Sequence, residues 1–223
     1  MVASFTIRPY QPADYEALAA VIKASYDYVD DDIAATRLQV DILHKLHPSG
    51  QLTAWVGNQL VGVNLTRKVP AYRYGDGHTE ATAFDTTLFV EDAQLADSLY
   101  SLDLVVLPSF RKLQIGKALH EQLMQQAFAE GFTYVIGLSR LNGYHRYQQQ
   151  LSAEEYVQKV LARELTDPSL TFNLQFDPRV IGVVKNCIPR DTKSCGYAVV
   201  LHVINPRFTP LLNGSQIVTE STE

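Results

Sequence analysis

The chain has 223 residues, of which 46% are hydrophobic and 10% aromatic, a composition typical of a globular protein that excludes collagen, a coiled coil and a disordered chain. Its length is enough for one large domain or two small ones with a buried core. The formal net charge of −5 provides no overall attraction to nucleic acid or to an anionic membrane, so we predict neither as a partner.

The cysteines, histidines and apolar runs predict a cytoplasmic protein without a bound metal. Cys187 and Cys195 are too few for a disulfide framework and have no neighbours at zinc-ligand spacing. His44 and His47 lie three residues apart on a predicted helix but have no third ligand. Apolar runs such as 18–22 are far shorter than the roughly 20 residues that span a bilayer, and no signal sequence is recognisable.

The first part of the chain predicts a strand followed by two helices. Residues 4–8 alternate with a period of two, and after Pro12 apolar side chains recur at helical spacing: Leu18, Val21, Ile22 and Tyr26. A second helix is predicted over 32–46. The helix dipole favours negative charge near its N-terminus, where the sequence has Asp30, Asp31 and Asp32.

A hairpin and a long excursion come next. The strand-like runs 52–56 and 60–65 lie on either side of a Gly-Asn turn, which predicts an antiparallel pair. Residues 68–97 have weak periodicity and many polar and small residues, including the segment from Tyr72 to His78. Because long loops often carry binding residues, this excursion is a candidate for substrate contacts.

The second half predicts alternating strands and helices with a loosely held tail. A helix over 115–130 has apolar residues on one face and Gly131 at its end, and Ser152 with Glu155 at capping-box spacing predicts another helix. From Asn205 onward the sequence is polar and has no period. The predicted strands are 99–107, 134–138, 170–176, 180–184 and 197–204.

The segment 102–119 is the most informative part of the chain. A strand enters a short loop that leads directly into a helix, and Gly116 in the first helical turn lets a ligand approach the backbone. Unpaired N–H groups at a helix N-terminus bind pyrophosphate, and positive charge is added by Arg111, Lys112 and Lys117. The segment therefore predicts an anion site; the alternative is that it only turns the chain.

This segment resembles the central motif of the GNAT superfamily of acyl-CoA-dependent N-acyltransferases, which reads Val-x-Pro-x-x-Arg before a Gly-rich loop and a helix. Val106, Pro108 and Arg111 match the motif, and Gly116 and Ala118 occupy its two later small positions. The resemblance implies that acetyl-CoA binds here. Its pantetheine arm would pair with the main chain of Leu104, Val105 and Val106, and its pyrophosphate with the loop and helix start: Arg111, Lys112, Leu113, Gln114, Ile115, Gly116, Lys117 and Ala118.

The sequence departs from the motif at two positions. Lys112 and Gln114 stand where the family usually has glycines. Gln114 fits the loop if its φ is negative, because a left-handed conformation is costly for residues other than glycine.

Downstream segments are similar to the GNAT subgroup that also occurs joined to carbon–nitrogen hydrolase domains; they are 139–144, 152–157, 167–172 and 191–196. No such hydrolase sequence is present in these 223 residues. The resemblance implies an α/β (α+β) fold with a mixed, mostly antiparallel central sheet flanked by helices. We expect a single domain over 1–204 and a C-terminal tail over 205–223.

Acetyl transfer to an amine requires an unprotonated amine and a proton for the departing sulfur. Asp103 is the first candidate for the base, since a carboxylate in a mostly apolar strand requires a partner; the alternative is a structural hydrogen bond or ion pair. Glu91 on the excursion is a weaker candidate.

Tyr144 and Tyr147 are candidates for the acid, because they follow the fifth strand, from which the superfamily commonly brings a tyrosine toward the sulfur. Spacing does not choose between them, and either side chain could simply pack. His145 beside them is a further candidate for proton transfer; the alternative is an exposed histidine without a role. Two roles are open for three further tyrosines, lining an acceptor site or packing in the core: Tyr72, Tyr74 and Tyr100.

The sequence as a whole predicts an N-acetyltransferase that moves acetyl from acetyl-CoA to a primary amine by direct attack, without a metal. The acceptor is a small molecule or a peptide, and the sequence does not identify it. A homodimer is compatible with the sequence. The alternative is a non-catalytic module with the same fold that senses acyl-CoA or binds a protein partner.

Overall fold

A computed structural model describes residues 4–26, 34–74 and 83–208. One sheet of seven strands has the order β1-β2-β3-β4-β5-β7-β6. Neighbouring strands are antiparallel except β4 and β5, which are parallel, so the predicted mixed, mostly antiparallel sheet is confirmed. The strands are β1 (Thr6–Pro9), β2 (Leu52–Val56), β3 (Gln59–Val69), β4 (Ser98–Val106), β5 (Tyr134–Arg140), β6 (Arg179–Val184) and β7 (Ala198–Ile204).

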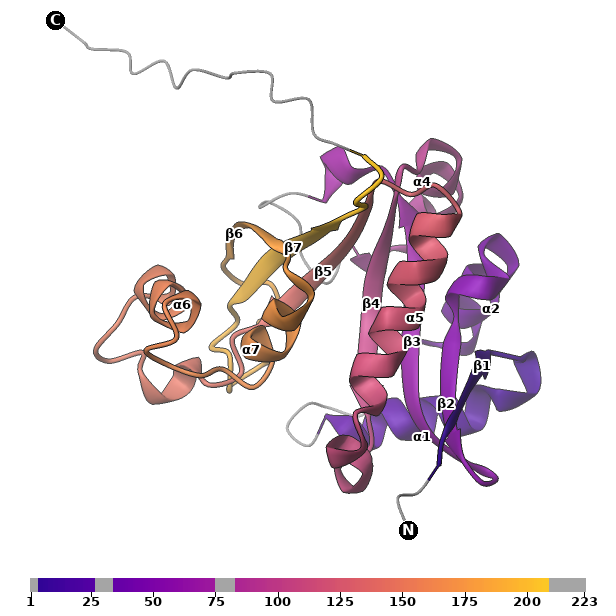
Figure 1. Ribbon diagram of the computed structural model, residues 1–223, viewed down its shortest axis with the longest axis horizontal. Helices are drawn as coiled ribbons and strands as arrows, with labels where there is room; N and C mark the ends of the chain where they lie inside the picture. Colours follow the sequence, from indigo (N-terminus) through magenta and orange to yellow (C-terminus); the bar gives the residue numbers. More distant parts are fainter. Residues whose placement is uncertain (1–3, 27–33, 75–82, 209–223) are drawn as a thin grey trace, which may run out of the picture.

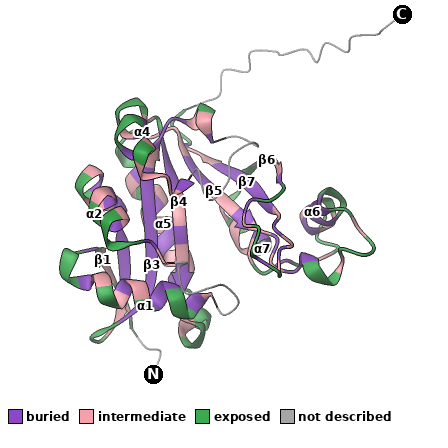
Figure 2. Cartoon of the chain, turned by 180° about the vertical axis from the view of Figure 1, so that it is seen from behind, coloured by how far each residue is buried: buried purple, intermediate pink, exposed green. Residues whose placement is uncertain are grey.

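Helices lie on both faces of the sheet (Figure 1). The helix α5 packs on one face of β2, β3 and β4, and α1 packs on the opposite face of β3 and β4. Figure 2 shows the central strands buried between these layers, while the outer surfaces of the helices are exposed. The helices are α1 (Tyr15–Ser25), α2 (Arg37–Leu46), α4 (Phe89–Leu95), α5 (Ile115–Ala129), α6 (Ala153–Leu161) and α7 (Leu170–Asn173).

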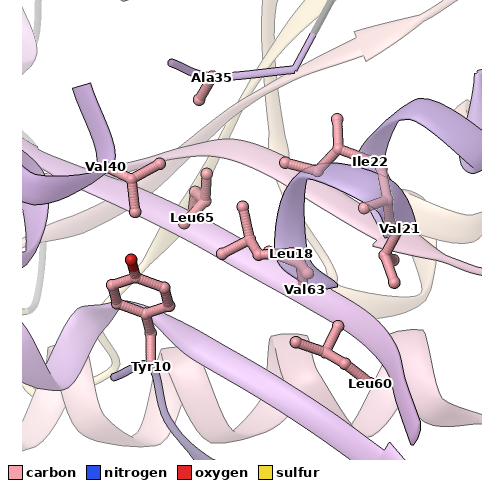
Figure 3. Close-up of a cluster of buried hydrophobic side chains, with 10 residues drawn as sticks. Tyr10, Leu18, Val21, Ile22, Ala35, Val40, Leu60, Val63 and Leu65 are labelled. Carbon is pink, nitrogen blue, oxygen red and sulfur yellow. The ribbon is translucent and has the colours of Figure 1, made fainter. Parts of the chain in front are cut away.

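The strand β3 contributes side chains to a core on each side of the sheet, with an irregular register at Val61. Val63 and Leu65 point to the α1 side and are fully buried there, together with Leu18 and Ile22 of α1 (Figure 3). Val61 belongs to the other cluster, beneath α5. Because both faces of the strand are covered, β3 is buried along most of its length.

The second helix begins later than predicted. Thr36 caps it, accepting a hydrogen bond from the Gln39 backbone while the Gln39 side chain accepts one from the Thr36 backbone. This capping box fixes the start at Arg37. The acidic triplet Asp30–Asp32 lies outside the described residues.

The predicted strand over 170–176 is wrong. The segment forms α7 and a following turn of 3-10 helix. The buried carboxylate of Asp167 accepts hydrogen bonds from the backbone N–H groups of Ser169 and Leu170, both at 2.9 Å, and so starts a helix. This local capping overrides the apolar pattern.

The start of the predicted tail is held in place. Asn205 is fully buried, and its side-chain amide donates to the carbonyls of Phe128 and Phe132. Residues 209–223 of the predicted tail lie outside the described residues.

The excursion is fastened to β3 by a buried cluster of charges around Asp92. Its carboxylate accepts from the guanidinium groups of Arg67 and Arg73 and, at 2.7 Å, from the hydroxyl of Tyr74. Asp92 and Tyr74 are fully buried. Residues 75–82 of the predicted excursion, including His78, lie outside the described residues.

Candidate active site

The candidate site lies where β4 and β5 separate. The two strands pair only from Ser98 with Tyr134 to Ser101 with Gly137. Beyond this point β4 continues to Val106 and β5 to Arg140 without pairing with each other, and the strands diverge (Figure 1). A cavity of about 540 Å³ is lined by both diverging segments. The backbone of β4 is therefore available there to a ligand.

Two groups of side chains line the cavity beside the strands. One group comes from α5 and α7 and includes Lys117, His120 and Phe172. The other comes from the end of α1 and the loop before β7, with Tyr26 and Lys193. The cavity thus connects the α5 side and the α1 side of the sheet through the gap between the strands.

The start of α5 forms one wall of the cavity. The first N–H groups of a helix have no partner within it, and those of Ile115, Gly116 and Lys117 hold these positions. A Cβ atom on Gly116 would lie 3.6 Å from both Phe172 and Val106, in ordinary contact, so the glycine leaves a narrow gap there. The N–H groups at a helix N-terminus, beside positive charge, suit an anion.

Gln114 precedes α5 in a left-handed conformation, with φ of 60°. The expected negative φ is therefore wrong. The chain passes from a 3-10 turn over Pro108–Leu113 directly into α5, and this reversal requires the positive φ that the family's glycine adopts easily.

Gln114→Gly is expected to raise the free energy of unfolding by up to about 1 kcal/mol, because it removes the steric cost of a left-handed non-glycine residue. Denaturant unfolding measures this change. Lys112→Gly is the matched control: it lies in the same turn without a positive φ, so glycine there should only destabilise. Equal effects of both variants would contradict the assignment of strain to Gln114.

Most of the residues expected to bind the cofactor line the cavity: Leu104, Val105, Val106, Arg111, Gln114, Gly116 and Lys117. Four do not: Lys112, Leu113, Ile115 and Ala118. Arg111 also has a structural role, since its guanidinium donates to the carbonyls of Val106 and Ser25, both at 3.1 Å. It thereby ties the loop to the ends of β4 and α1.

The vertex of the gap between the strands is open at Gly137. A Cβ atom at this position would meet no atom within 4 Å. Ser139, two residues further along β5, is 1% exposed and also lines the cavity. Its hydroxyl lies 3.1 Å from the side-chain nitrogen of Asn173 in α7.

Asp103 is buried, at 5% exposure, and points to the α1 side of β4. Its carboxylate accepts a hydrogen bond of 2.8 Å from the hydroxyl of Tyr26. Asp103 is not among the residues that line the cavity, whereas Tyr26 is. The predicted base therefore contacts the cavity through a tyrosine that the sequence analysis used only as a helix marker.

Tyr144 and Tyr147 do not line the cavity. Both pack in the cluster beneath α6, each with its ring about 5 Å from that of Tyr156. The hydroxyl of Tyr144 donates to the carbonyl of Leu151 at 2.9 Å, and burial raises its pKa. Exposed His145 contacts the carbonyl of Lys193.

The other candidate side chains also lie away from the cavity. Tyr74 and Tyr100 pack against each other in a buried cluster, and Tyr72 is 74% exposed. Glu91 forms an exposed ion pair with Arg73 at 2.5 Å. Of the two open roles for the tyrosines, packing is the one observed for Tyr74 and Tyr100.

Arg140 at the end of β5 is a lining residue that the sequence analysis included only within the segment 139–144, without a role of its own. Its Nε donates to the buried carboxylate of Asp191 at 2.6 Å, and the guanidinium lies 5.5 Å from the ring of Tyr26. The pair is 51 residues apart in sequence, so no local pattern could have found it.

His120 is a second lining residue that the sequence analysis missed. It lies one helical turn after Gly116 on the same face of α5, a spacing that could have revealed it. The ring is 6% exposed, packs 4.4 Å from the ring of Phe176, and has no hydrogen-bond partner at Nδ1. Burial lowers the pKa of His120 to about 4.

Because the pKa of buried His120 is lowered, we expect the free energy of unfolding to decrease on mild acidification. The folded state resists protonation down to about pH 4, whereas the unfolded chain is protonated below about pH 6.5, so stability falls as the pH decreases between these values. Between pH 7.5 and pH 5 the wild type is expected to lose about 2 kcal/mol more than His120→Phe in denaturant unfolding. Parallel losses in both proteins would contradict this role of His120.

Across the three described ranges, no group of three or more His, Cys, Asp or Glu side chains could hold a metal ion. Within the same ranges, no helix combines the length and apolar character required to cross a bilayer.

The sequence matches known proteins over most of its length. "Uncharacterized N-acetyltransferase YkwB" of Bacillus subtilis (strain 168) is 27% identical over 199 residues, which cover 89% of this chain and 88% of that protein. "Probable hydrolase YhcX" of the same organism is 27% identical over 170 residues, which cover 76% of this chain and 33% of that protein. The chain thus spans only a third of one relative and most of the other.

Two solved structures share the fold. The GphF GNAT-like decarboxylase in complex with isobutyryl-CoA superposes with a TM-score of 0.72 at 24% identity, covering 90% of this chain and 99% of that one. The loading GNATL domain of CurA from Lyngbya majuscula has a TM-score of 0.78 at 17% identity, covering 92% of this chain and 100% of that one.

The model of the Acetyltransferase (GNAT) family matches residues 15–149, more than half of the chain, and this range contains α1, the loop before α5 and both diverging strands. The chain therefore belongs to the GNAT family of acetyltransferases, which are transferase enzymes.

Proposed function

We propose that the protein transfers the acetyl group of acetyl-CoA to a primary amine by direct attack of the amine on the thioester. The observation that carries the proposal is the cavity between β4 and β5, which joins an unpaired strand edge to the N-terminus of α5. These features match the amide-rich and anionic parts of an acyl-CoA.

The lining residues suit each part of the ligand. The N–H groups at the start of α5 and the ammonium group of Lys117 are suited to the pyrophosphate. The free edge of β4 from Leu104 to Val106 offers hydrogen bonds to the amides of the pantetheine arm. Open space at Gly137 leaves room for the acyl group. Support also comes from GphF, a structural neighbour solved with isobutyryl-CoA.

The amine would approach from the α1 side, where Tyr26 lines the cavity. A carboxylate only accepts hydrogen bonds, so the Tyr26 hydroxyl donates its proton to Asp103. This arrangement allows the tyrosine oxygen to take a proton from the amine while it passes its own proton to the carboxylate. Acetyl-CoA supplies the activated acyl group.

Asp103→Asn is expected to lower kcat about 100-fold or more, because the amide cannot accept the relayed proton. The affinity for acetyl-CoA should change little, since Asp103 does not line the cavity. Steady-state kinetics against pH and binding titration separate the two effects. Tyr26→Phe should give a similar loss of kcat. If turnover and acetyl-CoA affinity fell equally, Asp103 would instead have a structural role.

The test of the proposed function is isothermal titration of the protein with acetyl-CoA, beside CoA and ADP, which lacks the pantetheine arm. Micromolar binding that depends on the arm, followed by release of CoA stimulated by amines, is expected. Binding without stimulation by any amine in a broad panel would favour the non-catalytic acyl-CoA-sensing module. Absence of binding at millimolar acetyl-CoA would overturn the proposal.

A further inference from the structure

Ser139 holds a distinctive position in the cavity. The paired part of β5 ends at Gly137, and side chains two residues apart on a strand share a face. Ser139 therefore points to the same side as the open space at Gly137, just beyond the vertex where β4 and β5 separate. Along the cavity wall, this is the β5 hydroxyl nearest in sequence to that vertex.

Asn173 fixes the orientation of this hydroxyl. One atom of the Asn173 amide lies 3.0 Å from the carbonyl oxygen of Ser169. A carbonyl oxygen only accepts hydrogen bonds, so this atom is the nitrogen Nδ2. The same nitrogen lies 3.1 Å from the oxygen of Ser139, which therefore accepts from it. The single hydroxyl proton of Ser139 must then point in another direction.

Asn173, the hydrogen-bond partner of Ser139, is itself held in place. Asn173 closes α7, a single turn of helix whose start is fixed by the buried Asp167 carboxylate. The backbone N–H of Asn173 also donates to Ser169, at 3.0 Å. Because Asn173 is held in place, the Ser139 hydroxyl that it orients needs little reorganisation when it donates to a ligand.

We propose that Ser139, oriented by Asn173, donates a hydrogen bond to the sulfur of the acyl-CoA thioester as that sulfur departs. In this step the amine nitrogen bonds to the carbonyl carbon, its proton passes toward Tyr26, and the electron pair of the C–S bond moves to sulfur. The thiolate accepts the hydrogen bond from Ser139 and takes its proton from solvent on release. Ser139 is a catalytic residue in this step, and Asn173 is a positioning residue.

This inference rests on the proposed function, but its test does not require the acceptor to be known. Dissociation constants of CoA and of desulfo-CoA, which lacks the thiol, are measured at pH 7 and pH 9.5. The wild type should gain affinity for CoA relative to desulfo-CoA at pH 9.5, where thiolate forms. In Ser139→Ala this gain should shrink about tenfold, because one hydrogen bond to a charged group is lost.

The wild type and Ser139→Ala share the other charged or titratable groups on the described cavity wall, so the effects of these groups cancel when the two proteins are compared. They are Tyr26, Arg111, Lys117, His120, Arg140 and Lys193. Ser98→Ala is the matched control, because Ser98 is equally buried, lies on the paired part of β4, donates to Asp97 and does not line the cavity. It should behave as the wild type. Ser139→Thr, which keeps the donor, should retain most of the gain.

Asn173→Asp tests the positioning role. It replaces the donor to Ser139 with an acceptor, so the serine proton turns toward α7 and the gain at pH 9.5 should be lost although Ser139 is still present. The inference is overturned if Ser139→Ala keeps the full gain of the wild type. If the wild type binds neither CoA nor acetyl-CoA, the proposed function itself has failed.

Discussion

Gly137→Val is expected to abolish measurable binding of acetyl-CoA while the protein stays folded. A Cβ atom at this position meets no protein atom within 4 Å, and Gly137 lines the cavity, so we expect the new side chain to extend into it. Gly137 lies within β5 and has no positive φ, and valine is a favourable strand residue. The melting temperature should therefore be unchanged or higher.

Isothermal titration with acetyl-CoA and a thermal melt of the same preparation measure the two effects. Gly137→Ala is the graded control. Its single methyl group is smaller than the side chain of valine, so it should weaken binding of acetyl-CoA less. Wild-type affinity in Gly137→Val would mean that acetyl-CoA does not reach the gap between β4 and β5.

Asp167→Ala is expected to lower the free energy of unfolding by at least about 3 kcal/mol, a large change for one residue. The carboxylate is fully buried and accepts four hydrogen bonds, from the hydroxyl of Tyr156 and the backbone N–H groups of Gly143, Ser169 and Leu170. Removing it leaves these donors buried and unpaired. Acetyl transfer should fall as well, because α7 carries Asn173.

Denaturant unfolding and turnover at a temperature where the variant remains folded measure these effects. Glu164→Ala is the control. It removes a carboxylate from an exposed ion pair with Lys159 of α6, in the segment that leads to α7. Its stability should match the wild type. An equally small effect of Asp167→Ala would mean that the loop around α7 is held by its apolar contacts alone.

Local signals in the sequence predicted many of the elements. The capping box of Ser152 and Glu155, the Gly-Asn turn between β2 and β3, and the glycine after α5 each act within a few residues of the chain. Such short-range contacts depend mainly on neighbouring residues, so a local pattern can reveal them. The acidic residues at 30–32 were a weaker guide than the Thr36 cap, because a cap requires a specific hydrogen bond.

The candidate site was predicted only where its residues are contiguous in the sequence. The loop and first turn of α5 form a contiguous segment, so a motif can identify them. The groups to which we assign catalytic or positioning roles come from separate segments: Tyr26 and Asp103 are 77 residues apart, and Ser139 and Asn173 are 34 apart. Tyr144 and Tyr147 had suitable chemistry, but their positions depend on how α6 packs against the strands.

The sequence by itself determined the hairpin of β2 and β3, most helices and the family motif at the start of α5, because each depends on neighbouring residues. The tertiary structure decided which polar side chains reach the cavity. It also brought Asn173 of α7 to Ser139 of β5. The physical reason is that pairing of β4 with β5 stops at Gly137, and this separation depends on the whole sheet and not on any short segment.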